Sequence, residues 1–278
     1  MFGSTVVEVA FGLVFCYASI ALIASSLQEA LASALRLRAQ TLLVGIKTML
    51  NDPGFTNLAR AVYRHALVNP HDDGRGLDQG SMKNKPSYIE PAHFAAALVD
   101  GLQSAPGDFE QLGRDIAVLP DAQLRTLLLG FHRRAGGDLQ HFQALLADWF
   151  DGAMERVSGT YKRRSQLICV LITLVLAILF NIDSIHLFRT LWQHPMLVAQ
   201  LGAAPGTLDD PHMIDALWNL PIGWQDYPPA NTSALLLKLV GWLLTASSAL
   251  FGAPFWFDML QRLVKVRGTG DKPAPESH

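Results

Sequence analysis

The chain has 278 residues, half of them apolar, with a mean hydropathy of +0.23 and a formal net charge of −2 at pH 7. Charged residues make up only 17% of it, whereas a soluble domain carries about 25%. The composition therefore argues against an ordinary soluble domain, and the nearly balanced charge argues against nucleic acid as a partner.

The first apolar segment lies close to the N-terminus. Residues 9–27 contain no charged side chain and approach the roughly 20 residues that cross about 30 Å of hydrocarbon. Glu8 stands where a cleavable signal peptide would carry Lys or Arg, so we expect this segment to be retained. We assign residues 1–30 to a first transmembrane helix.

Two long helices are predicted to leave the membrane. Good helix formers follow the first span, and leucines recur at three- and four-residue spacing, which predicts one helix over about 5–50, ended by "NDPG". A second amphipathic helix over about 138–164 is expected to run unbroken into the second span. Antiparallel pairing is the simplest way for these two stalk helices to bury their apolar stripes.

Between the stalks, the sequence predicts short helices and a polar loop. One helix is expected at 55–67, a second near Glu90, and a third after Asp121, which is a plausible N-terminal cap. No segment has the pattern of a strand, and no internal repeat is visible. Residues 31–165 are therefore predicted to form a helical domain.

Two further spans are predicted, at 166–188 and 234–257. The loop between them, 189–233, contains six of the fifteen prolines and three tryptophans. We expect part of it to lie on the membrane surface as a short helix, with partner binding as the alternative. Small residues in the third span favour close helix packing, and Pro254 is expected to kink it. Residues 258–278 are predicted to form an amphipathic helix and a disordered tail.

The distribution of Lys and Arg predicts the orientation. Sixteen of the twenty-two lie between residues 28 and 164, and four follow the third span. Cytoplasmic flanks collect these residues. We therefore expect the N-terminus and the 189–233 loop outside, and the 31–165 domain and the C-terminus in the cytoplasm. The run that would stop the second span at the cytoplasmic face consists of Lys162, Arg163 and Arg164.

This threading predicts two groups of polar residues. An outer polar layer, at the outer ends of all three spans, would contain Glu8, Asn181, Asp183 and Lys238. Such residues would serve as structural pairs, as simple interface groups or as an ion path. An inner-face joint would contain Glu29, Pro254, Trp256, Asp258 and Arg262. No carboxylate is expected at mid-span, where proton relays are built, which argues against a pump.

The sequence contains no catalytic motif that we can identify. An acidic loop offers four potential metal ligands, His71, Asp72, Asp73 and Asp78. Their spacing matches neither an EF-hand loop nor H-E-x-x-H, so we interpret the segment as a solvated loop. Cys16 and Cys169 belong to no C-x-x-C pattern. We expect no metal, no cofactor and no catalytic residue.

Several segments in order along the chain resemble a family of bacterial three-span inner-membrane proteins. They are "ALRLRAQTLLVGIKTML", "KPSYIEPAHFAAALVDGL", "ERVSGTYKRRSQ", "NIDSI", "LPIGW" and "GAPFWFDMLQRLVKVRGTG". The resemblance implies a bacterial inner-membrane protein with a cytoplasmic helical insert and a characteristic "GAPFWFD" motif. It implies no activity.

The overall prediction is an all-α integral membrane protein with three transmembrane helices, two of which extend into a cytoplasmic helical domain. We expect a non-enzymatic anchor or scaffold whose partners are the lipid bilayer and either a second protein or further copies of the chain. The main alternative is an oligomeric channel or membrane-permeabilising protein. An enzyme acting at the inner surface has only the acidic loop in its favour.

Overall fold

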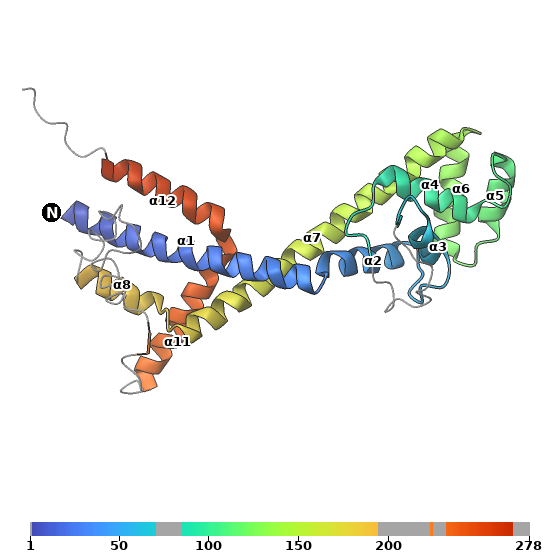
Figure 1. The fold of residues 1–278 in the computed structure, drawn as a ribbon. Helices are drawn as coiled ribbons and strands as arrows, with labels where there is room; N and C mark the ends of the chain where they lie inside the picture. The colour runs from blue at the N-terminus through green and yellow to red at the C-terminus, as the bar shows by residue number, and fades with distance from the viewer. Residues whose placement is uncertain (1, 71–84, 194–222, 225–231, 269–278) are drawn as a thin grey trace, which may run out of the picture. The chain divides into compact units, whose positions relative to one another are not determined.

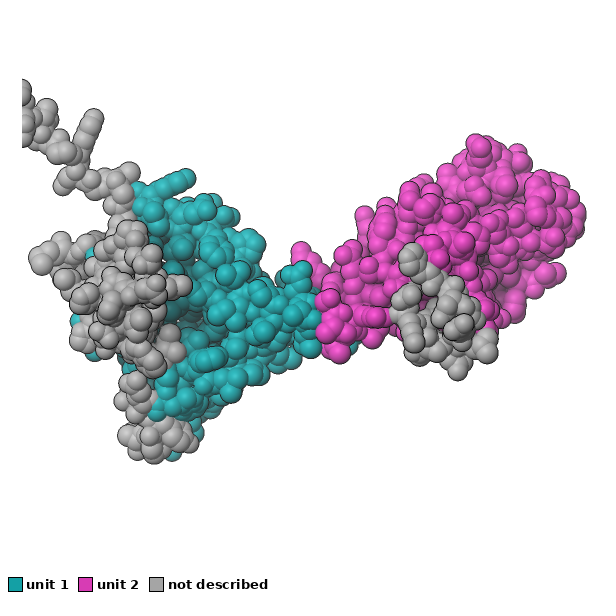
Figure 2. Space-filling view, viewed as in Figure 1, with its two compact units in different colours: residues 1–31, 164–278 teal, residues 32–163 magenta. Residues whose placement is uncertain are grey.

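The computed structural model describes residues 2–70, 85–193, 223–224 and 232–268 (Figure 1). Throughout these residues the regular elements are helices, and none is a strand. The all-α prediction is therefore confirmed for the described part of the chain. The chain divides into two compact units, which are Met1–Leu31 with Arg164–His278 (unit 1) and Ala32–Arg163 (unit 2) (Figure 2).

Unit 2 is a helical domain with its own core. Its helices are α2 (Leu37–Met49), α3 (Leu58–Arg64), α4 (Pro91–Leu102), α5 (Phe109–Ala117), α6 (Ala122–Ala135) and the first part of α7 (Leu139–Leu179). Their apolar faces meet in one cluster of buried side chains. The largest of these that are fully buried include Ile46, Tyr63, Phe94, Leu98, Leu128, Phe142 and Phe150.

Helices α2 and α7 pair as the stalk prediction requires. Leu42 and Ile46 of α2 share the core with Phe150 of α7. One pocket brings Arg38 beside Tyr161, whereas another brings Met49 beside Ala153. The two helices therefore run antiparallel, as the amphipathic stripes predicted.

The helix predicted over residues 5–50 is broken in the structure. Helix α1 (Phe2–Ala34) ends before Arg36, whose φ of 50° places it in the left-handed region, and α2 begins at Leu37. The Gln40 side-chain amide donates to the Leu35 carbonyl at 3.0 Å and so satisfies a group freed by the break. Because neither Gly nor Pro marks the position, the sequence pattern does not show it.

Caps define two helices of unit 2. The predicted cap at Asp121 is confirmed, since its Oδ1 accepts from the Leu124 N–H at 2.6 Å. Helix α5 is not among the predicted elements, yet Asp108 caps it by accepting from the Gln111 N–H at 2.9 Å. An Asp followed three residues later by Gln is a recognisable start signal.

Unit 1 contains the apolar helices. Besides α1 and the end of α7, it holds α8 (Ser184–Gln193), α11 (Thr232–Ser248), the 3-10 turn η1 (Ala249–Phe251) and α12 (Gly252–Gly268). Two stretches, Val6–Ala34 and Thr232–Lys265, are long and apolar enough to cross a membrane. The α7–α8 pair, bent by 56°, is a third if it counts as one span. The described residues thus provide two or three candidate spans.

The second and third predicted spans are both interrupted. Helix α7 runs unbroken from Leu139, as predicted, but it ends at Leu179 rather than continuing to residue 188. In the third span, the break falls at η1 and Gly252, whose φ of 75° is available to glycine without strain. It therefore precedes Pro254, where the kink was predicted.

Candidate functional site

The break between α7 and α8 is a defined helix corner rather than a frayed end. The Asn181 N–H donates to the Ile178 carbonyl at 3.1 Å, and the Ile182 N–H donates to the Ala177 carbonyl at 2.8 Å. Asn181 has a φ of 50°. This pair of bonds around a left-handed residue is the Schellman motif, in which Asn is the usual substitute for Gly.

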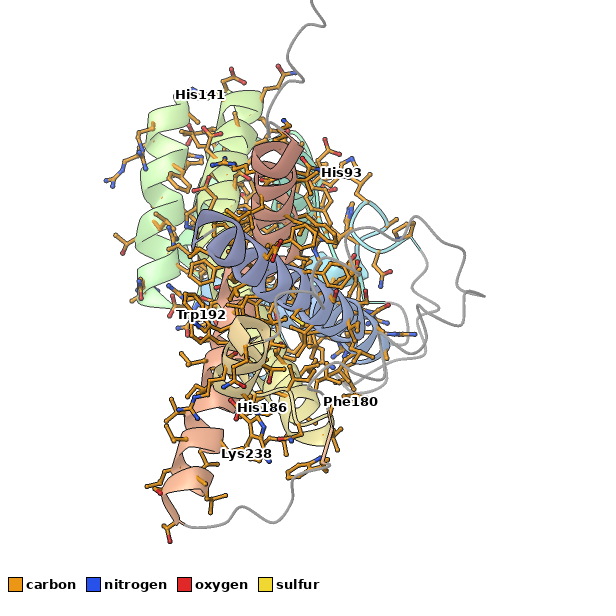
Figure 3. The ribbon with its side chains drawn as sticks, turned by 90° about the vertical axis from the view of Figure 1, so that its left-hand side faces the viewer. His93, His141, Phe180, His186, Trp192 and Lys238 are labelled. Carbon is orange, nitrogen blue, oxygen red and sulfur yellow. The ribbon has the colours of Figure 1, made fainter. Side chains whose placement is uncertain are left out.

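Asp183 starts the next helix immediately. Its Oδ1 accepts from the Ile185 N–H at 2.8 Å and from the His186 N–H at 3.2 Å. These are two of the amides at the N-terminus of α8 that have no partner within the helix. The His186 N–H would bond to the Ile182 carbonyl in a continuous helix, so capping by Asp183 leaves that carbonyl to find another donor. Phe180 and His186, which flank the corner, are labelled in Figure 3.

Helix α11 supplies the missing donors. The Thr245 hydroxyl lies 2.8 Å from the Ile182 carbonyl, and the Trp242 indole N–H donates to the Asn181 side-chain oxygen at 3.2 Å. All of these side chains are buried. Gly241 lies on the same face of α11, and a β-carbon there would overlap the Asp183 carboxylate. The corner and α11 therefore fit together through both hydrogen bonds and shape.

Three hydroxyl groups form a chain that ends at the same carbonyl. The Tyr17 hydroxyl donates to Ser184 Oγ at 2.9 Å, and Ser184 Oγ lies 2.7 Å from Thr245 Oγ1. One hydroxyl has one proton to donate. Thr245 Oγ1 also lies 3.0 Å from the Gly241 carbonyl. Its one proton can therefore go to either carbonyl or to Ser184 Oγ. This chain joins α1, α8 and α11 at one buried point.

The corner lies near the middle of the first apolar segment. Ser184 contacts Tyr17, whereas Leu187 and Leu191 pack further along, in a cluster with Val9. Helix α8 therefore continues beside the N-terminal half of α1, as Figure 1 also shows. The bent α7–α8 pair has the form of a broken span or of a re-entrant loop. In either form, the polar groups of its corner are buried in protein.

The four residues of the predicted outer polar layer do not form one layer. Asn181 and Asp183 lie at the corner, near Tyr17, whereas Glu8 is nine residues earlier on α1, about 13 Å along the helix. The Lys238 ammonium lies 5.0 Å from the centre of the Trp224 ring. Among the described residues it forms no ion pair with Glu8 or Asp183. The sequence pattern does not show that residues 181–183 form a corner that packs against α1 and α11.

Trp224 connects Lys238 to the corner. Its indole N–H donates to the Leu179 carbonyl at 3.1 Å, one of the groups freed at the end of α7. The Asn181 side-chain amide donates to the carbonyl of Gly223, the neighbouring residue. The short described segment 223–224 therefore also provides hydrogen-bond partners for polar groups of the corner.

The predicted inner-face joint is not one cluster either. Trp256 donates its indole N–H to the Ser248 carbonyl at 2.8 Å, and its ring lies 4.9 Å from that of Tyr17. It therefore lies near the same level of α1 as the corner. The other four residues are exposed, namely Glu29, Pro254, Asp258 and Arg262. Glu29 is twelve residues beyond Tyr17, about 18 Å along α1.

The remaining predicted residues divide into two groups. The side chains of Lys162, Arg163 and Arg164 are exposed on α7, next to the apolar stretch that begins at Leu167. The acidic loop, with His71, Asp72, Asp73 and Asp78, lies outside the described residues. Among those that are described, no group of three His, Cys, Asp or Glu side chains is placed to hold a metal ion.

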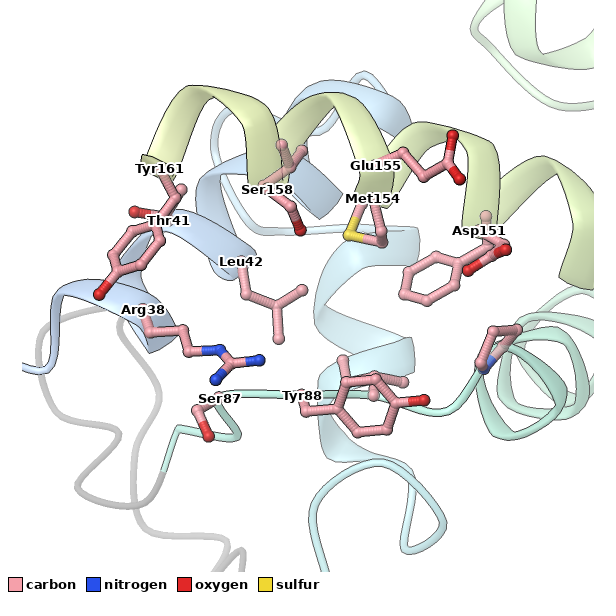
Figure 4. A pocket seen from close by; sticks show the side chains of 14 residues that line it. Arg38, Thr41, Leu42, Ser87, Tyr88, Asp151, Met154, Glu155, Ser158 and Tyr161 are labelled. Carbon is pink, nitrogen blue, oxygen red and sulfur yellow. The ribbon is translucent and has the colours of Figure 1, made fainter. Parts of the chain in front are cut away.

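Unit 2 contributes a pocket that the sequence analysis did not identify. It has a volume of about 420 Å³ and lies between α2, α7 and the segment that leads into α4 (Figure 4). Arg38, Tyr88, Asp151 and Ser158 are among its lining side chains. No periodic signal marks this site, because its walls come from three segments separated in the sequence.

Comparisons of the chain with protein-family models, curated proteins and solved structures found no match. The family resemblance of the sequence therefore stays an expectation. The described residues offer two candidate sites, the polar corner in unit 1 and the pocket in unit 2.

Proposed function

We propose that the chain is a bacterial inner-membrane protein that crosses the membrane three times and presents unit 2 to a protein partner in the cytoplasm. In this proposal α1, the broken α7–α8 pair and α11 are the spans. The N-terminus lies outside and the C-terminus inside. The protein acts as a non-enzymatic anchor or scaffold.

The observation that carries this proposal is the core of unit 2. Its helices bury large side chains such as Phe94, Phe142 and Phe150 completely, whereas the apolar residues of α11 are largely exposed within unit 1. A helix with exposed leucines suits a lipid environment, and a domain with a buried core suits water. Lys162, Arg163 and Arg164 are exposed and lie in the sequence where unit 2 meets unit 1. They support a cytoplasmic position for unit 2.

Cysteine accessibility tests the orientation. With Cys16 and Cys169 replaced by Ala, a single cysteine is introduced at Ser4 or at Asp138, and intact spheroplasts are treated with a membrane-impermeant maleimide. We expect labelling of Ser4→Cys, and labelling of Asp138→Cys only after the membrane is permeabilised. The reverse pattern would contradict the proposed threading.

Affinity purification from native membranes in mild detergent, followed by mass measurement of the intact assembly, tests the role. A soluble protein present at a fixed stoichiometry, and lost when the exposed surface of unit 2 is altered, is the expected result. Assemblies that contain only copies of this chain would contradict the scaffold proposal.

A second candidate function, an ion-conducting oligomer, is favoured by one observation. Asp183 is a buried carboxylate at the break of a candidate membrane span, and ionisable residues in such positions are often functional. Asp183→Asn removes the charge and keeps a good helix cap. If the corner conducts ions, conductance of the reconstituted protein should change in this variant while its fold is retained. Equal conductance, or none in either protein, rejects this candidate.

A further inference from the structure

The pocket of unit 2 has the composition of a small-molecule site. Its volume of about 420 Å³ lies within the roughly 300–1,000 Å³ of known ligand pockets, which combine apolar walls with a few convergent polar groups. The apolar walls come from Leu42, Ile89, Phe150 and Met154. Both the pocket and its lining belong entirely to unit 2.

Arg38 provides a cation at one end of this pocket. Figure 4 shows its guanidinium pointing into the space, near Ser87 and below Ser158. In the part of the chain that the structure describes, Arg38 has no ion pair and no hydrogen bond. A guanidinium presents a planar fork of donors that matches a carboxylate or phosphate group. The unpaired fork is therefore the binding group that the pocket offers.

The opposite end of the pocket is acidic. Asp151 lies seven residues before Ser158 on α7, about 10 Å along the helix. Glu155 also lines the pocket, but its carboxylate points away from the space in Figure 4. Figure 4 shows Asp151 and Arg38 at opposite ends of the pocket, and no ion pair joins them among the described residues. Asp151 opposes a second negative charge at the far end of a ligand.

We propose that this pocket binds an amphipathic anion with a single carboxylate or phosphate head group. Its carboxylate or phosphate head contacts the Arg38 guanidinium and the hydroxyls of Ser87 and Ser158, and its hydrocarbon body lies on Leu42 and Met154. Such a ligand comes either from the membrane, as a fatty acid or lysophospholipid, or from solution. The site is independent of the proposed function and stands whether or not a protein partner exists.

Photolabelling of the full chain in phosphatidylcholine nanodiscs tests the proposal. The probe is a palmitate analogue with a diazirine in its alkyl chain, and peptide mass spectrometry locates the labelled residues. We expect labels on α2, on residues 87–91 and on α7 between Phe150 and Tyr161. Arg38→Gln should weaken competition by unlabelled palmitate at least about tenfold, because a charged hydrogen bond is lost. Ser158→Phe should abolish labelling by filling the pocket.

Matched controls separate this site from general partitioning. Arg133→Gln makes the same charge change at an exposed position of α6 away from the pocket and should label like the unaltered chain. Hexadecanol, which lacks the anionic head, should not compete. If palmitate competes and hexyl phosphate does not, the ligand is membrane-derived. If both compete, the ligand is a soluble anion. Failure of both anions to compete, labels elsewhere, or Arg38→Gln behaving like Arg133→Gln would overturn the proposal.

Discussion

The Asp183 carboxylate packs directly against the backbone of Gly241, at a distance that leaves no room for a β-carbon on α11. This contact joins the N-terminal cap of α8 to the middle of α11, two elements separated by the whole 194–231 segment. Close approach through a small residue is the usual way for helices to pack in lipid. Here it also covers the buried Asp183 side chain.

Replacing Gly241 by Ala should therefore destabilise unit 1. The new methyl group must displace the Asp183 side chain, and overpacking of this kind costs about 1–3 kcal/mol. Thermal unfolding of the purified protein in detergent measures the effect. Gly159→Ala in α7 is the matched control, because no atom lies within 4 Å of its added β-carbon. That change should be neutral or stabilising, since Ala favours a helix over Gly. Equal effects of the two changes would contradict the proposed contact.

Asp183 should tolerate Asn better than Ala. Asn keeps an oxygen that accepts from the Ile185 and His186 amides, whereas Ala leaves both unpaired in a buried position. Loss of a helix cap costs about 0.5–2 kcal/mol. We expect the thermal midpoint to fall clearly for Asp183→Ala and little for Asp183→Asn. A larger loss for Asn would instead show that the negative charge itself stabilises the corner.

The stability of unit 2 should fall in acid because of two exposed carboxylates. The Ser104 N–H and hydroxyl and the Gln111 side chain lower the pKa of Asp115. The Leu124 N–H and the Asn51 side chain lower the pKa of Asp121. In both cases the folded-state pKa lies below the unfolded value of 3.8. The resulting stabilisation is complete at a pH above 3.8. It is lost as the pH falls through the folded-state pKa.

Thermal melts of the full chain between about pH 6 and pH 2 check this expectation. Asp115→Asn and Asp121→Asn should each flatten the acid-side dependence, because Asn does not titrate. Glu110→Gln changes an exposed carboxylate of α5 that makes no hydrogen bond among the described residues. It serves as the control and should leave the dependence unchanged.

Tyr63→Phe should stabilise the protein or leave it unchanged. The Tyr63 side chain is fully buried, and within the described part of the chain its hydroxyl has no hydrogen-bond partner. Burial also raises the pKa of this hydroxyl. A buried polar group without a partner costs about 1–3 kcal/mol, so its removal recovers part of that. Phe94→Leu, which removes a stacked ring from the same core, should destabilise. Loss of stability in Tyr63→Phe would reveal a partner for the hydroxyl.

The helices of unit 2 could be predicted where local signals decide them. Asp121 is a cap in the sequence and in the structure, and the helix formers around Gly152 and Gly159 kept α7 unbroken as expected. The signal for α5, Asp108 followed by Gln111, was present and was not used. The break at Arg36 could not be predicted, because a left-handed Arg has no distinctive sequence pattern.

The polar corner could be predicted only in part. Asn181 followed by Asp183 is a plausible sequence for a helix end and a new cap. Hydropathy alone placed it at the edge of the membrane. Its position beside the middle of α1 and α11 depends on contacts with Tyr17 and Thr245, which are distant in sequence. The pocket around Arg38 likewise depends on tertiary structure, since nothing in the sequence pairs residues 87–91 with α2 and α7.

The bond from Thr245 to the Ile182 carbonyl has a consequence for biosynthesis. The two residues are 63 positions apart, so at 5–20 residues per second the ribosome needs roughly 3–13 s to make the second after the first. During that interval the corner has been synthesised, but Trp242 and Thr245, which form hydrogen bonds with its polar groups, have not. A polar break of this kind is poorly suited to lipid alone. If the proposed spans are correct, stable insertion of the α7–α8 pair should wait for α11. A later segment of the chain would then be required to stabilise an earlier one.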